Sequence, residues 1–268
     1  MIIAQISDLH ICPPGVLAYR RVDTAALLSR CVEQIGRMTP RPDLVLATGD
    51  LVDRGRPDEY RHLRELLAPL SVPVYLIPGN HDERGALARE FSEHTYLPRE
   101  GKFLHYVLEQ YPVRLICLDT LIPGEGGGEM CEERLAWLGA RLAEAPARPT
   151  VIAMHHAPFL TGIAHMDRVG LDNGEPLGRL VERHPQVERV LCGHLHRPIQ
   201  LRWHGTVVMT APSTAHQVVL DLREDSPAEF IMEPPAFMVH VWREGTGLLS
   251  HTSYVGDFAG PFAFHPAQ

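Results

Sequence analysis

Cysteine is scarce in this chain of 268 residues, and its spacing matches no pairing or metal-binding pattern. The cysteines are odd in number, lie far apart and never form Cys-x-x-Cys; they are Cys12, Cys31, Cys117, Cys131 and Cys192. Such spacing is typical of reduced thiols and not of a disulfide framework or a zinc site closed by thiolates. We therefore predict a cytoplasmic protein whose fold needs neither disulfides nor a structural zinc site.

Positive charge and long apolar runs are also scarce. The chain has 25 Lys and Arg against 33 Asp and Glu, which gives a formal net charge of -8. Proteins that wrap nucleic acid or lie on anionic membranes need a cationic face, so both partner classes are disfavoured. No apolar run approaches the ~20 residues that cross a bilayer, and the first residues, which we predict to be a strand, lack the basic segment of a signal peptide. We expect a small-molecule partner, no nucleic acid polymer and no membrane.

The sequence has no internal repeat, low-complexity tract or long linker. At this length one large α/β unit buries enough surface to be stable without a structural metal. From about His196 onward, alternation of Val, Thr and aromatic residues replaces the earlier pattern. We predict a main core over residues 1–200 and a β-rich extension over residues 201–268 that completes the fold. Residues 219–255 are predicted to form a cap or a contact between copies in a homo-oligomer.

Short apolar runs alternate with amphipathic stretches, as expected for buried strands covered by helices in an α/β fold. The predicted strands are residues 2–6, 44–47, 72–77, 115–118, 151–154 and 187–192. The predicted helices are residues 22–38, 58–67, 84–91, 132–143 and 177–184. In the extension, residues 205–210, 236–242 and 248–254 are predicted strands, and residues 243–247 are typical of a hairpin turn.

The 16 histidines outnumber the phenylalanines two to one, and many directly follow predicted strands. Five strands end in metal-ligand residue types: Asp8 and His10; Asp50 and Asp53; Asn80, His81 and Asp82; His155 and His156; His194 and His196. Open α/β sheets build their sites at such strand ends, so we expect five strands of one sheet to bring these side chains together. Mixed carboxylate and imidazole shells fit Zn, Mn, Fe or Co. The pattern therefore predicts a transition-metal site.

These motifs together resemble the signature of the calcineurin-like metallophosphoesterase superfamily. They are Asp8-x-His10, Gly49-Asp50-x-x-Asp53, Gly79-Asn80-His81-Asp82, His155 and Gly193-His194-x-His196. Within the superfamily the chain is most similar to the bacterial class III cyclic nucleotide phosphodiesterases and the binuclear-metal glycerophosphodiesterases, through residues 75–82, 154–158, 166–174, 214–218 and 258–261. The resemblance implies an αββα sandwich of two mixed β-sheets flanked by helices, with a small C-terminal β-rich extension.

The resemblance also implies two transition-metal ions per chain, and it assigns their ligands residue by residue. Asp8, His10 and His196 hold one ion, Asn80, His155 and His194 hold the other, and Asp50 bridges the two. Asp50, Asn80 and His81 are the implied catalytic residues, with His81 over the phosphate and leaving group or, alternatively, only orienting a neighbour. The implied substrate contacts are Asn80, His81, His156 and His216, of which the last two could instead be structural. Asp53 and Asp82 are expected to orient ligand histidines from behind.

The function that follows is hydrolysis of small phosphodiesters, cyclic AMP or glycerophosphodiesters, by metal-bound hydroxide. Two divalent ions, two aspartates and one hydroxide leave a net charge of about +1, which suits a phosphodiester monoanion. Two alternatives stay open. Residues 49–55 also resemble the motif of serine/threonine protein phosphatases, and some proteins keep this fold as a scaffold without catalysis. Tyr19, Phe159 and Trp203 are candidate stacking groups for a nucleobase.

Overall fold

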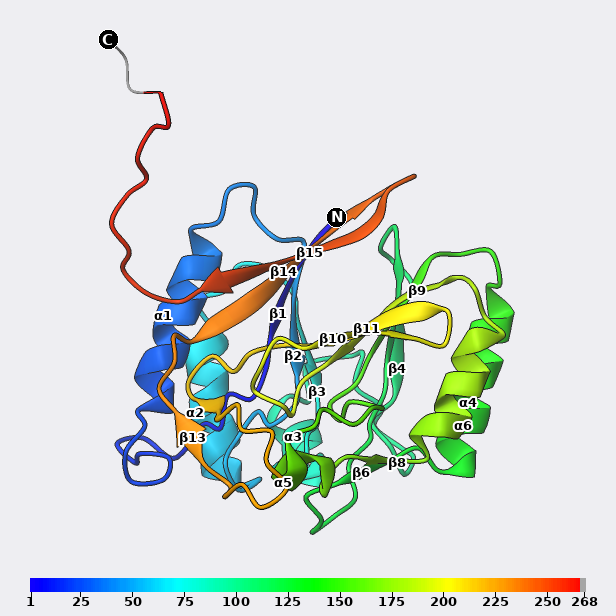
Figure 1. Ribbon diagram of the computed structural model, residues 1–268, viewed down its shortest axis with the longest axis horizontal. Helices are drawn as coiled ribbons and strands as arrows, with labels where there is room; N and C mark the ends of the chain where they lie inside the picture. Colours follow the sequence, from blue (N-terminus) through cyan, green and yellow to red (C-terminus); the bar gives the residue numbers. More distant parts are fainter. Residues whose placement is uncertain (266–268) are drawn as a thin grey trace.

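The computed structural model describes residues 1–265 and places two mixed β-sheets between two outer layers of helices (Figure 1). The first sheet has the order β15-β14-β1-β2-β3. Its strands are β1 (Ile2–Ile6), β2 (Leu44–Thr48), β3 (Val74–Ile77), β14 (Ala236–Arg243) and β15 (Gly247–Tyr254). Strands β1, β2 and β3 are parallel, whereas β14 pairs antiparallel with β1 and β15 with β14.

The second sheet has the order β10-β11-β9-β7-β5-β4. Its strands are β4 (Tyr106–Leu108), β5 (Arg114–Cys117), β7 (Thr150–Ala153), β9 (Val187–Cys192), β10 (Gln200–Trp203) and β11 (Thr206–Thr210). The inner strands β5, β7, β9 and β11 are parallel, and the two edge strands are antiparallel to their neighbours. The strands that carry the predicted site residues therefore belong to two sheets, so the expectation of a single sheet is wrong. The two-sheet sandwich implied by the family resemblance is confirmed.

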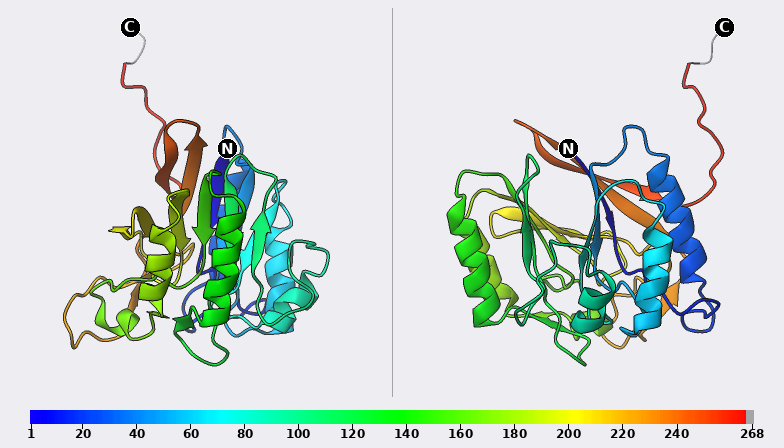
Figure 2. Two further views of the ribbon diagram at one scale, coloured as in Figure 1. Left: turned by 90° about the vertical axis from the view of Figure 1, so that its right-hand side faces the viewer. Right: turned by 180° about the vertical axis from the view of Figure 1, so that it is seen from behind.

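Helices cover the outer face of each sheet (Figure 2). On the side of the first sheet lie α1 (Thr24–Gly36), α2 (Pro57–Leu67) and α3 (Arg84–Glu90), and on the other side lie α4 (Glu132–Glu144) and α6 (Gly174–Glu182). In α1 the buried residues Leu28, Val32 and Ile35 recur at three- and four-residue spacing, as the sequence pattern predicts. The Asp23 side chain begins this helix by accepting a hydrogen bond from the backbone N–H of Ala26.

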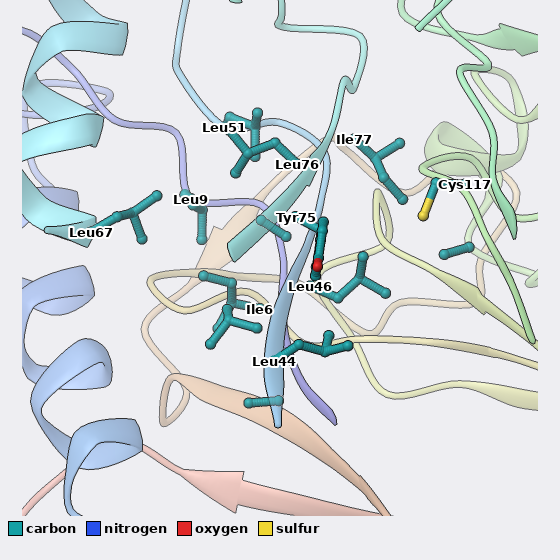
Figure 3. Packing of buried hydrophobic residues seen from close by; sticks show 14 of the residues in the cluster. Ile6, Leu9, Leu44, Leu46, Leu51, Leu67, Tyr75, Leu76, Ile77 and Cys117 are labelled. Atoms are coloured by element: carbon teal, nitrogen blue, oxygen red, sulfur yellow. The ribbon is translucent and has the colours of Figure 1, made fainter. Parts of the chain in front are cut away.

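Strands β1, β2 and β3 of the first sheet are buried on both faces, because helices cover one face and the second sheet covers the other. All five residues of β2 are buried, and Figure 3 shows Leu44, Leu46, Ile6 and Leu76 packed in this layer. A run of continuously buried residues is the expected sequence of an inner parallel strand. The result is a rigid base beneath the loops that leave the strand ends.

Several short elements have no clear periodicity, and the sequence pattern does not predict them. Strand β10 exposes its first three residues at the edge of the second sheet. Two small ribbons join β12 (Gln217–Val218) to β13 (Phe230–Ile231) and β6 (Gly128–Glu129) to β8 (Leu171–Asp172). A four-residue helix, α5 (Ala164–Asp167), lies just before β8.

The C-terminal segment contributes strands to both sheets. Strand β11 pairs with β9 and β14 pairs with β1, while the predicted hairpin of β14 and β15 is confirmed. The division at residue 200 stays a prediction. After β15 the chain runs away from the body of the protein (Figure 1). None of the helices described is both long and apolar enough to cross a bilayer.

Candidate metal centre

The loops that follow β1, β2, β3, β7 and β9 meet at one edge of the sandwich, where the two sheets face each other. Asp8 and His10 follow β1, Asp50 follows β2, and Asn80 follows β3. From the second sheet, His155 follows β7 and the pair His194 and His196 follows β9. Six of the seven predicted ligands are buried, and Asn80 is half-buried. The structure therefore brings the whole predicted ligand set together across the seam between the sheets.

Four of these side chains form a first group that matches one predicted ion. Nε2 of His10 lies 3.2 Å from Nε2 of His196 and 3.6 Å from Oδ2 of Asp50, and Nε2 of His196 lies 3.5 Å from Oδ1 of Asp8. One ligand atom from each of the four lies within 4.8 Å of the others. Such short distances between lone-pair atoms are those expected of a shared cation.

A second group lies on the other side of Asp50. Nε2 of His155 is 3.1 Å from Oδ1 of Asn80 and 3.3 Å from Oδ1 of Asp50. The His194 ring packs 5.1 Å from the His155 ring. The two carboxylate oxygens of Asp50 thus face different groups, Oδ2 towards His10 and Oδ1 towards His155. This is the position required of a bridging ligand.

Hydrogen bonds to backbone carbonyls fix which ring nitrogen each ligand histidine can offer. Nδ1 of His196 donates to the carbonyl of His216 at 2.9 Å, and Nδ1 of His155 donates to the carbonyl of Thr48 at 2.8 Å. Nε2 of His194 donates to the carbonyl of Val169 at 2.9 Å. Each ring then keeps one lone pair for the centre, which is the usual arrangement behind a metal-bound imidazole. The donor set of carboxylates, imidazoles and one amide oxygen fits Zn, Mn, Fe or Co.

The electrostatics of the centre depend on Asp50. Burial alone would raise the pKa of this carboxyl, but His155, His81 and His10 hold it well below its ordinary value. Burial would likewise lower the pKa of His155, but the Asp50 carboxylate raises it to about 9. Burial lowers the pKa of His194 to about 3, so its ring is neutral near pH 7. Asp50 therefore stays negative, and a cation held beside it would displace the proton from His155.

The backbone at the centre is held in an unusual conformation. Positive φ angles occur at five of the seven predicted ligands: Asp8 (54°), His10 (44°), Asp50 (48°), His194 (69°) and His196 (48°). Non-glycine residues seldom adopt this region, and such strain concentrates at functional sites. Gly79 is required because an added Cβ there would fall against the backbone N and Oδ1 of Asp50 and 2.9 Å from Cε1 of His155.

His81 lies at the rim of the centre. Its ring packs edge-on against the His10 ring with centroids 4.6 Å apart, and its Nδ1 donates to the carbonyl of Asp53 at 2.8 Å. Burial lowers the pKa of His81, but Asp50 and the Asp53 carbonyl raise it above its ordinary value overall. Among residues 1–265 its Nε2 has no hydrogen-bond partner, so it can take a proton or a ligand oxygen, as the predicted role requires.

The two predicted supporting aspartates differ in their contacts. Oδ1 of Asp53 lies 4.0 Å from Nδ1 of His10, beside that ring but beyond hydrogen-bond distance. Asp82 contacts backbone instead of a histidine: its Oδ2 accepts from the N–H groups of Leu51 and Gly79, and its Oδ1 accepts from the Tyr60 hydroxyl. Asp82 therefore fixes the two loops that carry Asp50 and Asn80, and the expectation that it orients a histidine is not met.

His156 and His216, the other predicted substrate contacts, are both buried. Nδ1 of His156 accepts from the Thr120 hydroxyl at 2.8 Å and its Nε2 donates to the carbonyl of Gly126 at 3.3 Å, so both ring nitrogens are occupied. This favours a positioning role for His156. His216 packs 4.8 Å from the His196 ring, and its Nδ1 has no hydrogen-bond partner within residues 1–265.

Sequence reasoning missed Thr120 and Tyr60. Thr120 comes just after the end of β5, so the same strand-end rule that identified the ligands could have found it. Tyr60 lies on the buried face of α2 and resembles an ordinary core residue in sequence.

Of the three candidate stacking groups, Tyr19 lies against the metal centre, with its ring 5.2 Å from the His216 ring. Trp203 packs against His204, and Phe159 lines a neighbouring hollow.

Comparison with known proteins gives the family and the fold. Residues 1–198 match the model of the calcineurin-like phosphoesterase family. The chain is 44% identical over 266 residues to a probable glycerophosphodiester phosphodiesterase, GpdQ, of Arcobacter nitrofigilis, covering 99% of this chain and 97% of that one. It is 33% identical over 215 residues to the 3',5'-cyclic adenosine monophosphate phosphodiesterase CpdA of Escherichia coli, covering 80% and 76% of the two chains.

Solved structures of low sequence identity share the fold. A dimetal phosphatase from Danio rerio superposes with a TM-score of 0.68 at 19% identity, covering 96% of this chain and 99% of that one. A purple acid phosphatase from yellow lupin gives 0.72 at 15% identity, covering 95% of this chain and 51% of that one. By its motifs, its two-sheet sandwich and these matches, the chain belongs to the calcineurin-like phosphoesterase family.

Proposed function

We propose that this protein is a binuclear metal-dependent phosphodiesterase that hydrolyses small phosphodiesters. The observation that carries the proposal is the position of Asp50, whose two oxygens lie 3.6 Å from Nε2 of His10 and 3.3 Å from Nε2 of His155. The names of the relatives, a glycerophosphodiester phosphodiesterase and a cyclic AMP phosphodiesterase, support a diester as substrate. The proposed ligands are those that the family resemblance implies. Asp8, His10 and His196 would hold one ion, Asn80, His155 and His194 would hold the other, and Asp50 would lie between them.

Two transition-metal ions, Fe, Mn, Zn or Co, would when bound lower the pKa of an attacking water and offset negative charge on the phosphoryl oxygens. The chain itself contributes orientation and proton handling. Oδ1 of Asn80 lies 3.1 Å from Nε2 of His155, which leaves the side-chain NH2 of Asn80 to donate to a phosphoryl oxygen. His81, anchored through Nδ1 to the Asp53 carbonyl, can hold a proton at Nε2 for the leaving alkoxide.

A panel of substrates tests the proposal and separates its branches. The metal-reconstituted protein is assayed with cyclic AMP, a 2',3'-cyclic nucleotide, glycerophosphoethanolamine and an aryl phosphodiester. A hundredfold preference in kcat/KM, ~2.7 kcal/mol of transition-state discrimination, would identify the substrate class. Hydrolysis of a phosphomonoester in preference to all four diesters would contradict the proposal.

The proposal includes a cytoplasmic protein that forms a homo-oligomer through residues 219–255. Large apolar side chains that are exposed in this segment support the homo-oligomer. The exposed fractions are 59% for Leu220, 65% for Leu222 and 51% for Met232. Light scattering measures the molar mass of the protein in solution directly. A monomer at micromolar concentration would refute the oligomer and would leave the catalytic proposal unaffected.

A further inference from the structure

Three hollows border the metal centre. The one at Asn80 and His81, of about 580 Å³, shares lining residues with the other two, which carry opposite charge. The basic hollow, of about 730 Å³, is lined on its polar side by Arg20, Asp53, Arg54, Arg56, Glu59 and His81. The acidic hollow, of about 830 Å³, is lined by Glu125, Asp167, Asp172 and Glu175 with one cation, Arg168. A substituent with a negative charge is attracted by the basic hollow and repelled by the acidic hollow.

The guanidinium groups of the basic hollow are largely free to bind a ligand. Among residues 1–265, no carboxylate lies within 4.0 Å of the Arg20 or Arg56 guanidinium, and Arg54 contacts only Asp53, at 3.3 Å. Glu59, the other acid of the hollow, is occupied: its Oε2 accepts from the backbone N–H groups of Arg54 and Arg56, both at 3.0 Å. Three arginines around one hollow are notable in a chain with a net charge of -8.

The turn that carries Arg20 is fixed and not an open loop. Ala18 and Val22 exchange two backbone hydrogen bonds, each of 2.9 Å, across a tight loop. Within it, Tyr19 and Arg20 both have positive φ angles, 51° and 56°, a conformation that non-glycine residues keep only when the surroundings enforce it. The Tyr19 ring packs against His216 and Phe230, which holds the turn against the centre. Arg20 is thereby presented at the rim of the basic hollow.

His81 connects the basic hollow to the metal centre. It lines the hollow, and its ring lies 4.6 Å from the ring of the predicted ligand His10. A diester with its phosphate at the centre and one alcohol substituent extending past His81 would place that substituent in the hollow that the three arginines line. The acidic hollow lies on the other side, next to Gly126 and Val169, whose carbonyls hold His156 and His194.

We propose that the basic hollow is an anion subsite that selects phosphodiesters in which one alcohol carries a second negative group, a carboxylate or a phosphate. This inference rests on the proposed phosphodiesterase function and narrows its substrate class. Guanidinium groups suit both anions because their planar donors match carboxylate and phosphate oxygens. The three arginines are exposed, so each is expected to contribute modestly.

The test compares small monoesters that occupy the phosphate position and differ only in their tails. Ethyl phosphate, carboxymethyl phosphate and ethane-1,2-diyl bisphosphate are measured as competitive inhibitors of aryl diester hydrolysis by the metal-loaded protein, and as ligands by calorimetry. We expect the two charged-tail probes to bind about tenfold more tightly than ethyl phosphate, the sum of a few exposed charge contacts. Comparison of the carboxylate tail with the phosphate tail shows which anion the subsite prefers.

Arginine variants decide whether the hollow causes the preference. Arg20→Gln and Arg54→Gln should each reduce the tenfold ratio to about fivefold, and the double variant should bring it to about twofold, the share left to Arg56. Arg21→Gln is the matched control, because Arg21 is exposed, adjacent in sequence and not part of the hollow. A ratio near one in the wild-type protein, or a tenfold ratio that survives in the double variant because the tail chelates metal, would overturn the subsite. If no aryl diester is hydrolysed at all, the phosphodiesterase function fails, a result distinct from an active protein without tail preference.

Discussion

The backbone N–H of His194 donates to both carboxylate oxygens of Asp8, at 3.0 and 3.2 Å. Asp8 follows β1 of the first sheet and His194 follows β9 of the second, so this contact joins the two halves of the sandwich at the metal centre. Gly193, just before it, has no room for a side chain, because an added Cβ would fall against Ser7 and 2.7 Å from the carbonyl of Thr48. The ligands of the two proposed ions are thus positioned by the packing of one sheet on the other.

Asp50→Ala should abolish the bridge between the two ligand groups. Activity should fall about a thousandfold or more, because a bound metal supplies several kcal/mol of charge stabilisation. Metal content and kcat with an aryl diester, measured on the same preparation, check this. Full activity in the variant would show that the two-metal account is wrong.

His81→Ala should separate turnover from metal binding. His81 offers a free Nε2 to the leaving group but is outside both ligand groups, so the variant should keep its metals while kcat falls 10²–10⁴-fold, the usual range for a general acid. The half-buried His184, which lies between α6 and β9, provides the control: His184→Ala should match the wild-type protein in both measurements. If His81→Ala loses metal in proportion to activity, His81 acts as a ligand or ligand support instead.

Gly79→Ala should damage the centre without removing any ligand. The added methyl would meet Asp50 and His155, and overpacking of this kind costs about 1–3 kcal/mol of stability. We expect weaker metal binding in equilibrium titrations. Gly36→Ala, with nothing within 4 Å of the new Cβ, should bind metal like the wild-type protein. Unchanged metal affinity in Gly79→Ala would mean that the close approach at this glycine is not needed.

Most of the ligand set could be predicted from sequence because parallel buried strands deliver polar residues at one edge. The division of the strands into two sheets, with β1, β2 and β3 in one and β7 and β9 in the other, could not be predicted. A run of buried apolar residues has the same sequence pattern whichever sheet contains it. The positive φ angles at Asp8 and His194 were equally hidden, because they arise from contacts between loops of different sheets. The contact of Asp82 with Leu51 joins two separate loops and leaves no local signal in the sequence.

His240 should make the fold sensitive to mild acid. It is buried between Gln5 and Ser250, and burial lowers its pKa to about 3. Below the ordinary histidine pKa of 6.5, His240 binds a proton in the unfolded chain but stays neutral in the folded protein. The free energy of unfolding therefore falls as pH falls towards 3. From pH 7 to pH 5 this histidine should account for a loss of about 2 kcal/mol.

Denaturant unfolding at several pH values measures this effect. His240→Gln should show a smaller loss between pH 7 and pH 5 than the wild-type protein, whatever its stability at pH 7. His265→Gln, at an exposed position after β15, should follow the wild-type curve. Parallel curves for His240→Gln and wild type would show that His240 is not kept neutral in the folded state.

The central claim is that one chain holds two metal ions with Asp50 between them. Elemental analysis by mass spectrometry, after loading with Mn or Zn and removal of excess metal, counts the ions per chain directly. The structure predicts two equivalents in the wild-type protein and fewer than two in Asp50→Ala. One equivalent or none in the wild-type protein, or two retained in Asp50→Ala, would contradict the account.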